Sequence, residues 1–217
     1  MRTVDEFLQY VAAELVWRRK ELTQMRALVQ SAQGDLRQKA LIRASVAILY
    51  AHWEGFVKST GSAYLKYVAN QGVECNRLSY NFLALASKAF GADQDGFQAN
   101  LKVATYYSEN MGRRARVPYK GVVNTRSNLG SSVLRELLAV LGLPDEPFST
   151  KFAFIDSSLV NRRNHIAHGE YLDIDPNEYE DIHQEVLGLI EAFRNEVENA
   201  VVTKRYLRPV AHPTASS

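Results

Sequence analysis

The chain has 217 residues, of which 46% are hydrophobic and 23% charged, and its 26 basic and 24 acidic residues give a formal net charge of +2. This length can bury one sizeable core and does not require two, so we expect a single domain over residues 1–205. The near balance of charge excludes a polycation that coats nucleic acid indiscriminately. Any contact with nucleic acid must therefore come from local clusters of basic residues.

Cysteine usage and hydropathy indicate the compartment. The single cysteine, Cys75, excludes an internal disulfide and a multi-cysteine zinc site. The N-terminus carries Asp5 and Glu6 where a signal peptide has an apolar run, and no stretch of about 18 uncharged apolar residues occurs. We therefore expect a cytoplasmic protein that does not enter a membrane.

Apolar residues recur at helical spacing through the first 70 residues. The pattern predicts a long amphipathic helix over residues 4–33, with Thr3 or Asp5 as its N-cap, and a second long helix over residues 35–70. Two shorter and less regular helices are expected over residues 78–90 and 93–111.

The second long helix contains a polar pair, His52 and Glu54, among aromatic residues. Two interpretations stay open. Both side chains face solvent and pair with Lys58 or Arg43, or Glu54 is buried and holds an arginine in place, because a buried carboxylate needs a cationic or hydrogen-bonding partner.

The helical period disappears over residues 112–130, which we expect to form the longest loop, with a possible short strand at residues 121–123. This loop has the densest basic run of the chain: Arg113, Arg114, Arg116, Lys120 and Arg126. Interleaved with Tyr119, these side chains either follow a phosphate backbone or form a solvated connector.

The C-terminal half completes an all-α bundle. A short helix is expected over residues 131–141. The next helix, capped by Ser149 or Thr150, should end at Gly169. A final helix over residues 176–204 has Asp175 as N-cap and Pro176 in its first turn, and residues 206–217 should form a disordered tail.

The last turns of the helix that should end at Gly169 contain an unusual number of polar residues: Asn161, Arg162, Arg163, Asn164, His165 and His168. A metal site at His165 and His168 needs a third ligand, for which Glu170 and His183 are the candidates, and the adjacent arginines would repel the cation. Arginine and histidine without a nucleophilic side chain suit cleavage of RNA by its own 2′-hydroxyl. Alternatively, these residues only close hydrogen bonds at the helix end.

The segment from Arg163 to Gly169 resembles the R-N-x-x-x-H motif of the HEPN superfamily. The order of the other parts is also similar: two long helices, the second with Ala51-His52-Trp53-Glu54-Gly55-Phe56, then an insertion, the motif helix and a long final helix. The resemblance covers residues 4–205 and is most specific to the MAE-like branch.

The resemblance implies a helical-bundle endoribonuclease that works as a homodimer without metal or another cofactor. It leaves a 2′,3′-cyclic phosphate and a 5′-hydroxyl, and its relatives include toxins and antiphage effectors restrained by an antitoxin or sensor protein. Arg163 would stabilise the transition state, His168 would act as base or acid, and Asn164 would orient the site. Glu54 would hold Arg163, whereas Arg162 and His165 match no fixed motif position.

Two features qualify this expectation. Five residues on an ideal helix correspond to about 140° around the axis, so Arg163 and His168 do not share a face unless the helix loosens or two chains combine. Position 170 is Glu, with the tyrosine at Tyr171, which departs from branches regulated by modification of a tyrosine two residues after the histidine. The alternative function is a non-catalytic module that binds RNA or a nucleotide, or that partners another effector.

Overall fold

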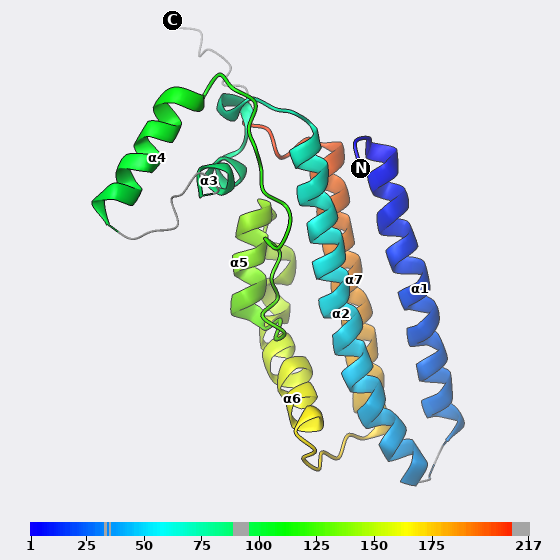
Figure 1. Cartoon of the computed structure of the whole chain (residues 1–217). Coiled ribbons are helices and arrows are strands. Elements are labelled where there is room, and N and C mark those ends of the chain that lie inside the picture. The colour runs from blue at the N-terminus through cyan, green and yellow to red at the C-terminus, as the bar shows by residue number, and fades with distance from the viewer. Residues whose placement is uncertain (33, 35, 89–95, 210–217) are drawn as a thin grey trace, which may run out of the picture.

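The computed structural model describes residues 1–32, 34, 36–88 and 96–209. Throughout these residues the regular structure is helical and no strand forms, which confirms the predicted all-α class. Figure 1 shows the long helices α1 (Val4–Ser31), α2 (Leu36–Asn70) and α7 (Pro176–Val202) side by side. α2 is the central helix, because it packs against α1, α7, α5 and the motif segment. No helix in the described ranges combines the length and the apolar character that crossing a bilayer requires.

Capping side chains set the starts of the outer helices. Thr3 caps α1 by accepting a hydrogen bond from the backbone N–H of Glu6, and the Glu6 carboxylate accepts from the backbone of Thr3 in return. Asp175 caps α7 through the N–H groups of Asn177 and Glu178, next to Pro176 in the first turn. The sequence therefore predicted both starts, and Thr3 rather than Asp5 is the cap.

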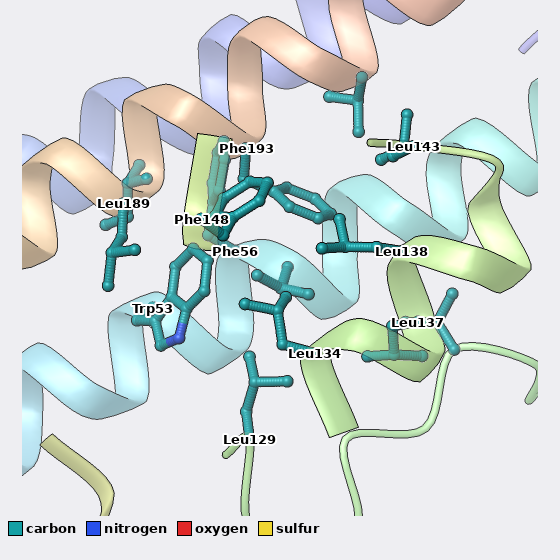
Figure 2. Close-up of a cluster of buried hydrophobic side chains, with 14 of the residues drawn as sticks. Trp53, Phe56, Leu129, Leu134, Leu137, Leu138, Leu143, Phe148, Leu189 and Phe193 are labelled. Atoms are coloured by element: carbon teal, nitrogen blue, oxygen red, sulfur yellow. The ribbon is translucent and has the colours of Figure 1, made fainter. Parts of the chain in front are cut away.

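The main hydrophobic core lies where α2, α7 and α5 (Ser131–Leu141) meet, as Figure 2 shows. Trp53 and Phe56 of α2 pack edge to face against Phe193 of α7, with ring centroids 6.2 Å and 6.4 Å apart. All three side chains are fully buried, and each such burial contributes about 1.5–3 kcal/mol. This core fixes the face of α2 on which the motif segment rests.

The shorter helices α3 (Tyr80–Lys88) and α4 (Phe97–Asn110) lie beside one end of the bundle (Figure 1). A small separate cluster of Cys75, Leu83, Ala86 and Tyr106 holds them together, and η1 (Cys75–Arg77) leads into it. They correspond to the helices predicted over 78–90 and 93–111, and residues 89–95 are outside the described part.

The prediction of a possible short strand at residues 121–123 is wrong. These residues have no neighbouring strand to pair with, and Val123 instead packs against α2 at Gly61. A Cβ atom at Gly61 would lie 3.2 Å from Leu141 and 3.5 Å from Val123, so the missing side chain lets both residues approach the helix.

Two predicted boundaries also change. Ser149 and Thr150 do not cap the motif helix, because they lie inside the 3-10 helix η2 (Glu146–Lys151), which continues into Phe152 without a break. The folded domain extends past residue 205: Tyr206 is buried, and the backbone N–H of Arg208 donates to the carbonyl of Arg77 at 2.9 Å. The part of the predicted tail at residues 210–217 is outside the described residues.

Candidate active site

The motif follows a change of helical pitch. A π-helical segment, η3 (Phe154–Asn161), leads directly into the short helix α6 (Arg162–Ala167). Ile155 and Leu159 of η3 are fully buried and anchor the segment in the core. π-Helical turns are rare and are frequent at functional sites, which marks this segment as more than a connector.

Gly169 ends the motif helix, as predicted. Its φ of +75° is in the left-handed region, which glycine enters at least cost. The N–H of Gly169 donates to the carbonyl of Ile166 at 3.1 Å, and the N–H of Glu170 donates to that of His165 at 2.9 Å. These two bonds form a Schellman motif, so the backbone itself satisfies the carbonyls at this end.

Arg163 is held entirely by neutral groups. Its guanidinium lies over the ring of Tyr50 on α2, 4.1 Å from the centroid. One nitrogen, Nη2, donates to the carbonyl of Ser127 at 2.7 Å and to the side-chain oxygen of Asn128 at 3.2 Å. Because no carboxylate in the described residues pairs with Arg163, its positive charge is oriented without being neutralised.

The loop that holds Arg163 is anchored directly after the two residues that contact it. The N–H of Leu129, a fully buried residue, donates to the Tyr50 hydroxyl at 2.7 Å. Asp156 of η3 accepts hydrogen bonds from the backbone N–H of Ser131 at 2.7 Å and from its hydroxyl at 2.6 Å. Just before these anchors, Arg126 and Ser127 both have φ of 54°, an uncommon conformation for residues with side chains that sets the direction of the Ser127 carbonyl.

Arg162 and His165 have carboxylate partners within the chain. Arg162 donates to Glu178 in the first turn of α7, and His165 contacts Glu170 through its Nδ1 atom. These pairs tie the motif helix to α7 and to the turn that follows it. The structure thus gives a structural role to the two residues whose roles the sequence left open.

His168 is exposed at the C-cap of α6. Within the described ranges its imidazole has neither a hydrogen bond nor an ion pair. Asn164, one position after Arg163, is half-buried and its carbonyl accepts the backbone N–H of His168 at 2.9 Å. Among the described residues, no carboxylate therefore pairs with Arg163 or with His168, the arginine and the histidine of the motif.

Arg163 and His168 have different surroundings within one chain. The backbone is α-helical from Arg162 to Ala167, and the wider π-helical turns end before Arg163, so the offset of about 140° applies. Arg163 points toward α2 and the 126–129 loop, whereas His168 is at the exposed end of the helix.

Glu54 and His52 occupy different environments. Glu54 lies one turn after Tyr50 on α2, and no hydrogen bond or ion pair joins it to Arg163 in the described structure; Tyr50 and the 126–129 loop hold Arg163 instead. His52 is buried and lies 3.2 Å from the carboxylate of Glu21 on α1, so the interpretation in which His52 faces solvent is wrong. Burial lowers the pKa of His52, an effect that Glu21 partly offsets.

The basic loop does not gather all its cations at Arg163. Arg113, Arg114 and Arg116 line a cavity of about 390 Å³ beside Tyr106 of α4. Figure 1 places that end of the loop opposite the end where α6 lies. Lys120 lines a different pocket, and Arg126 pairs with Glu136 at 2.8 Å. Of the five residues, Arg126 alone is adjacent to the segment that contacts Arg163.

The candidate metal ligands are not assembled. Within the described ranges, no three His, Cys, Asp or Glu side chains form a group able to hold a metal ion. His183, one of the possible third ligands, is buried in α7, and Glu170 pairs with His165. His165 and His168 thus remain without the third ligand that zinc requires.

Three residues that hold Arg163 could not be identified from the sequence: Tyr50, Ser127 and Asn128. Tyr50 occupies an ordinary apolar position of α2, and the carbonyl of Ser127 is a backbone group that any residue would supply. The contact depends on where the loop lies, which helical periodicity does not report.

The family model described as MAE_28990-like HEPN matches residues 7–206, nearly the whole chain. The chain belongs to the HEPN superfamily. The resemblance in the motif and in the order of helices is thereby confirmed at the level of the family. Neither a curated protein nor a solved structure matches this HEPN chain.

The match fits a nuclease-related or RNA-related HEPN module. In the described part of this HEPN domain the motif residues Arg163 and His168 have no acidic partner, whereas Arg162 and His165, which match no fixed motif position, each have one. The ion pairs therefore divide the arginines and histidines of this segment into the same two groups as the family motif does.

Proposed function

We propose that this HEPN protein is a metal-independent RNA endonuclease whose site is built from Arg163, Asn164 and His168 of two chains. The observation that carries the proposal is the state of Arg163, a guanidinium oriented by Tyr50 and Ser127 that has no carboxylate partner among the described residues. A fixed and unneutralised cation is the group that an anionic transition state requires.

The reaction needs no nucleophile from the protein. The 2′-hydroxyl of the ribose attacks the adjacent phosphorus, and His168 of one chain takes the proton from that hydroxyl. The bond from phosphorus to the 5′-oxygen then breaks, and the departing oxygen receives a proton from the second His168. Arg163 donates hydrogen bonds to the phosphoryl oxygens as their charge increases. The products are a 2′,3′-cyclic phosphate and a 5′-hydroxyl.

A homodimer accounts for the separation of the two residues around the helix. Two α6 helices that face each other would offer two arginines and two histidines to one phosphodiester. His168 of one chain could then reach a phosphate bound by Arg163 of the other. The exposure of His168 supports this arrangement, since a base that acts across an interface must be accessible.

The biological setting is proposed from the family rather than from the geometry. HEPN relatives with an intact arginine and histidine include toxins and antiphage effectors, and we assign this chain to that group, acting in the cytoplasm. An antitoxin or sensor protein would restrain it.

One observation favours the alternative of a non-catalytic module. The Nη2 atom of Arg163 already donates to Ser127 and Asn128, and its Nε atom is buried, so a substrate phosphate must use Nη1 or displace the loop. If the loop keeps these hydrogen bonds when a ligand is present, the protein binds RNA or a nucleotide without cleaving it, or it partners another effector.

The deciding experiment compares His168→Ala with His165→Ala. Purified wild-type protein and both variants are incubated with total cellular RNA in the presence of a chelator. We expect cleavage by wild type and by His165→Ala and loss of cleavage in His168→Ala, with unchanged circular dichroism. Cleavage retained in His168→Ala would rule out the assignment. RNA binding without turnover in all three proteins over a wide pH range would support the non-catalytic module.

A further inference from the structure

A second site lies away from the motif. A pocket of about 670 Å³ opens between the start of α1, the C-terminal half of α2 and the 112–130 loop. We call it the N-terminal pocket; its lining includes Tyr10, Ser59, Ser62, Lys66, Tyr119 and Lys120. Its volume falls within the range of small-molecule sites, about 300–1,000 Å³. Along the axis of α2, Lys66 lies about 24 Å from Tyr50, the residue that holds Arg163.

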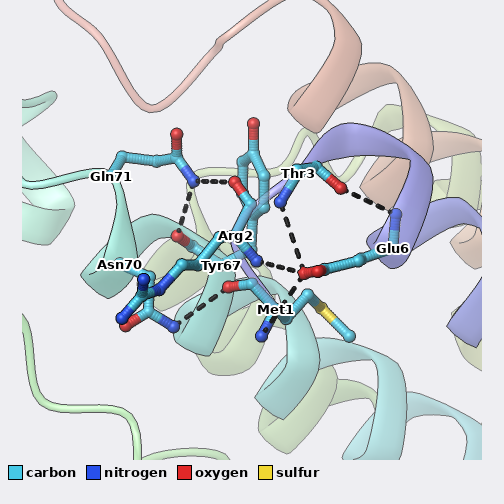
Figure 3. A network of polar contacts seen from close by, with 7 residues as sticks. All are labelled: Met1, Arg2, Thr3, Glu6, Tyr67, Asn70 and Gln71. Carbon is cyan, nitrogen blue, oxygen red and sulfur yellow. Dashed lines mark hydrogen bonds and ion pairs between the residues drawn. The ribbon is translucent and has the colours of Figure 1, made fainter.

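The walls of the N-terminal pocket are held in place. Figure 3 shows the start of the chain tied to the end of α2: Asn70 donates to the carbonyl of Met1 at 3.0 Å, and Gln71 donates to that of Arg2 at 3.0 Å. On the loop side, Val123 is buried against Gly61 just after Gly121 turns the chain with a φ of +72°. The pocket is therefore formed before any ligand arrives.

The charge of the pocket suits an anion. Within the described ranges, neither Lys66 nor Lys120 has an ion pair or a side-chain hydrogen bond, and both are exposed at the rim. The carboxylate in the lining, Glu6, accepts hydrogen bonds from the backbone N–H groups of Arg2 and Thr3, which lower its pKa. Because Glu6 is engaged at the start of α1, it does not pair with the lysines.

The remaining groups suit an aromatic ring and a sugar. Tyr10 of α1 and Tyr119 of the loop both line the pocket, and both side chains are partly exposed. Ser59 and Ser62 of α2 add hydroxyls to the lining, and the Ser59 hydroxyl is oriented by donating to Glu14 at 2.8 Å. Bases stack on tyrosine, ribose hydroxyls bond to serine, and phosphate is bound by lysine.

From this combination we propose that the N-terminal pocket binds a nucleotide, either free or as an unpaired residue of an RNA strand. The base lies against Tyr10 and Tyr119, and the phosphate lies between Lys66 and Lys120. The same loop then continues to Ser127, so an occupied pocket and Arg163 share one segment of backbone. The proposal stands whether or not the motif cleaves RNA.

The test measures binding by isothermal titration calorimetry with the purified full chain. The ligands are adenosine and guanosine monophosphate, a short unstructured RNA, adenosine without phosphate, and inorganic pyrophosphate. The variants are Lys66→Ala/Lys120→Ala and Tyr119→Ala, with Lys102→Ala on α4 as the control for loss of one surface charge. Circular dichroism and thermal unfolding verify that each variant is folded.

We expect saturable binding of nucleotides that weakens about tenfold in Lys66→Ala/Lys120→Ala and in Tyr119→Ala but not in Lys102→Ala. If RNA binds more tightly than the monophosphate, the pocket is a subsite for an RNA strand. If the two bind equally, the ligand is a free nucleotide. Both results support the proposal. Pyrophosphate binding as tight as nucleotide binding would overturn it. So would nucleotide binding lost in Arg163→Ala and retained in the pocket variants, or no binding at millimolar ligand. Cleavage assayed separately keeps this result independent of the proposed nuclease.

Discussion

The guanidinium of Arg163 lies 4.1 Å from the centroid of the Tyr50 ring, and the hydroxyl of that ring accepts the N–H of Leu129 at 2.7 Å. Tyr50 therefore connects the motif helix to the loop whose Ser127 carbonyl also holds Arg163. One side chain on the central helix thus contacts the motif arginine and anchors the loop that holds it.

Tyr50 variants should separate these two roles. Tyr50→Phe keeps the ring and leaves the buried N–H of Leu129 without an acceptor, so the free energy of unfolding should fall by about 1–3 kcal/mol. Tyr50→Leu also removes the surface beneath Arg163 and should lower kcat by about fivefold more than Tyr50→Phe, equivalent to about 1 kcal/mol. Urea denaturation and single-turnover cleavage measure the two effects. Equal kcat in both variants would mean that the ring does not position Arg163.

Arg162 and Arg163 are neighbours with different expected phenotypes. Arg162→Ala removes the pair with Glu178 and should destabilise the fold by about 1 kcal/mol while cleavage per folded molecule is retained. Arg163→Ala should abolish cleavage, and Arg163→Lys should not restore it, because a lysine cannot form the bidentate contact. Cleavage rates well below the melting temperature provide the comparison. Loss of cleavage in Arg162→Ala with Arg163→Ala still active would reverse the assignment.

Buried histidines should make stability depend on pH. Burial lowers the pKa of His52 and of His183 below the ordinary value of 6.5. At acidic pH the unfolded chain therefore binds more protons than the folded chain does. The free energy of unfolding should be greatest above pH about 6.5 and should fall as the pH drops below it.

The variant His183→Leu tests that cause. It should make the free energy of unfolding less dependent on pH between about pH 7 and pH 5. Urea unfolding at several pH values measures the slope. An identical slope in wild type and His183→Leu would show that this histidine does not contribute.

The arginines at residues 113–116 should affect RNA affinity rather than chemistry. They lie at the end of the molecule away from α6, so Arg113→Ala/Arg114→Ala/Arg116→Ala should weaken RNA binding and leave kcat unchanged. The slope of affinity against salt concentration should become less steep by about 0.7 per lost contact. Unchanged affinity and slope would favour the solvated connector that the sequence left open.

Local sequence signals predicted much of this structure because the groups involved are close along the chain. Gly169 ends the motif helix and Asp175 caps α7 through bonds that span a few residues. The long helices follow from their apolar period. The π-helical segment η3 was not predicted, since its buried Ile155 and Leu159 also fit an ordinary helix.

The surroundings of the motif depend on contacts between distant segments, which is why the sequence did not predict them. Ser127 meets Arg163 because the loop passes over α2, and Glu178 meets Arg162 because α7 begins beside α6. His52 is buried because α1 covers it and supplies Glu21. No spacing pattern within one helix contains this information.

The most direct test of the account is the chemical identity of the RNA ends that the purified protein produces in the presence of a chelator. Attack by the 2′-hydroxyl at a site of arginine and histidine predicts 2′,3′-cyclic phosphate and 5′-hydroxyl ends, lost in His168→Ala and kept in His165→Ala. Ends with a 3′-hydroxyl and a 5′-phosphate, or cleavage that stops when the chelator is added, would contradict the central claim.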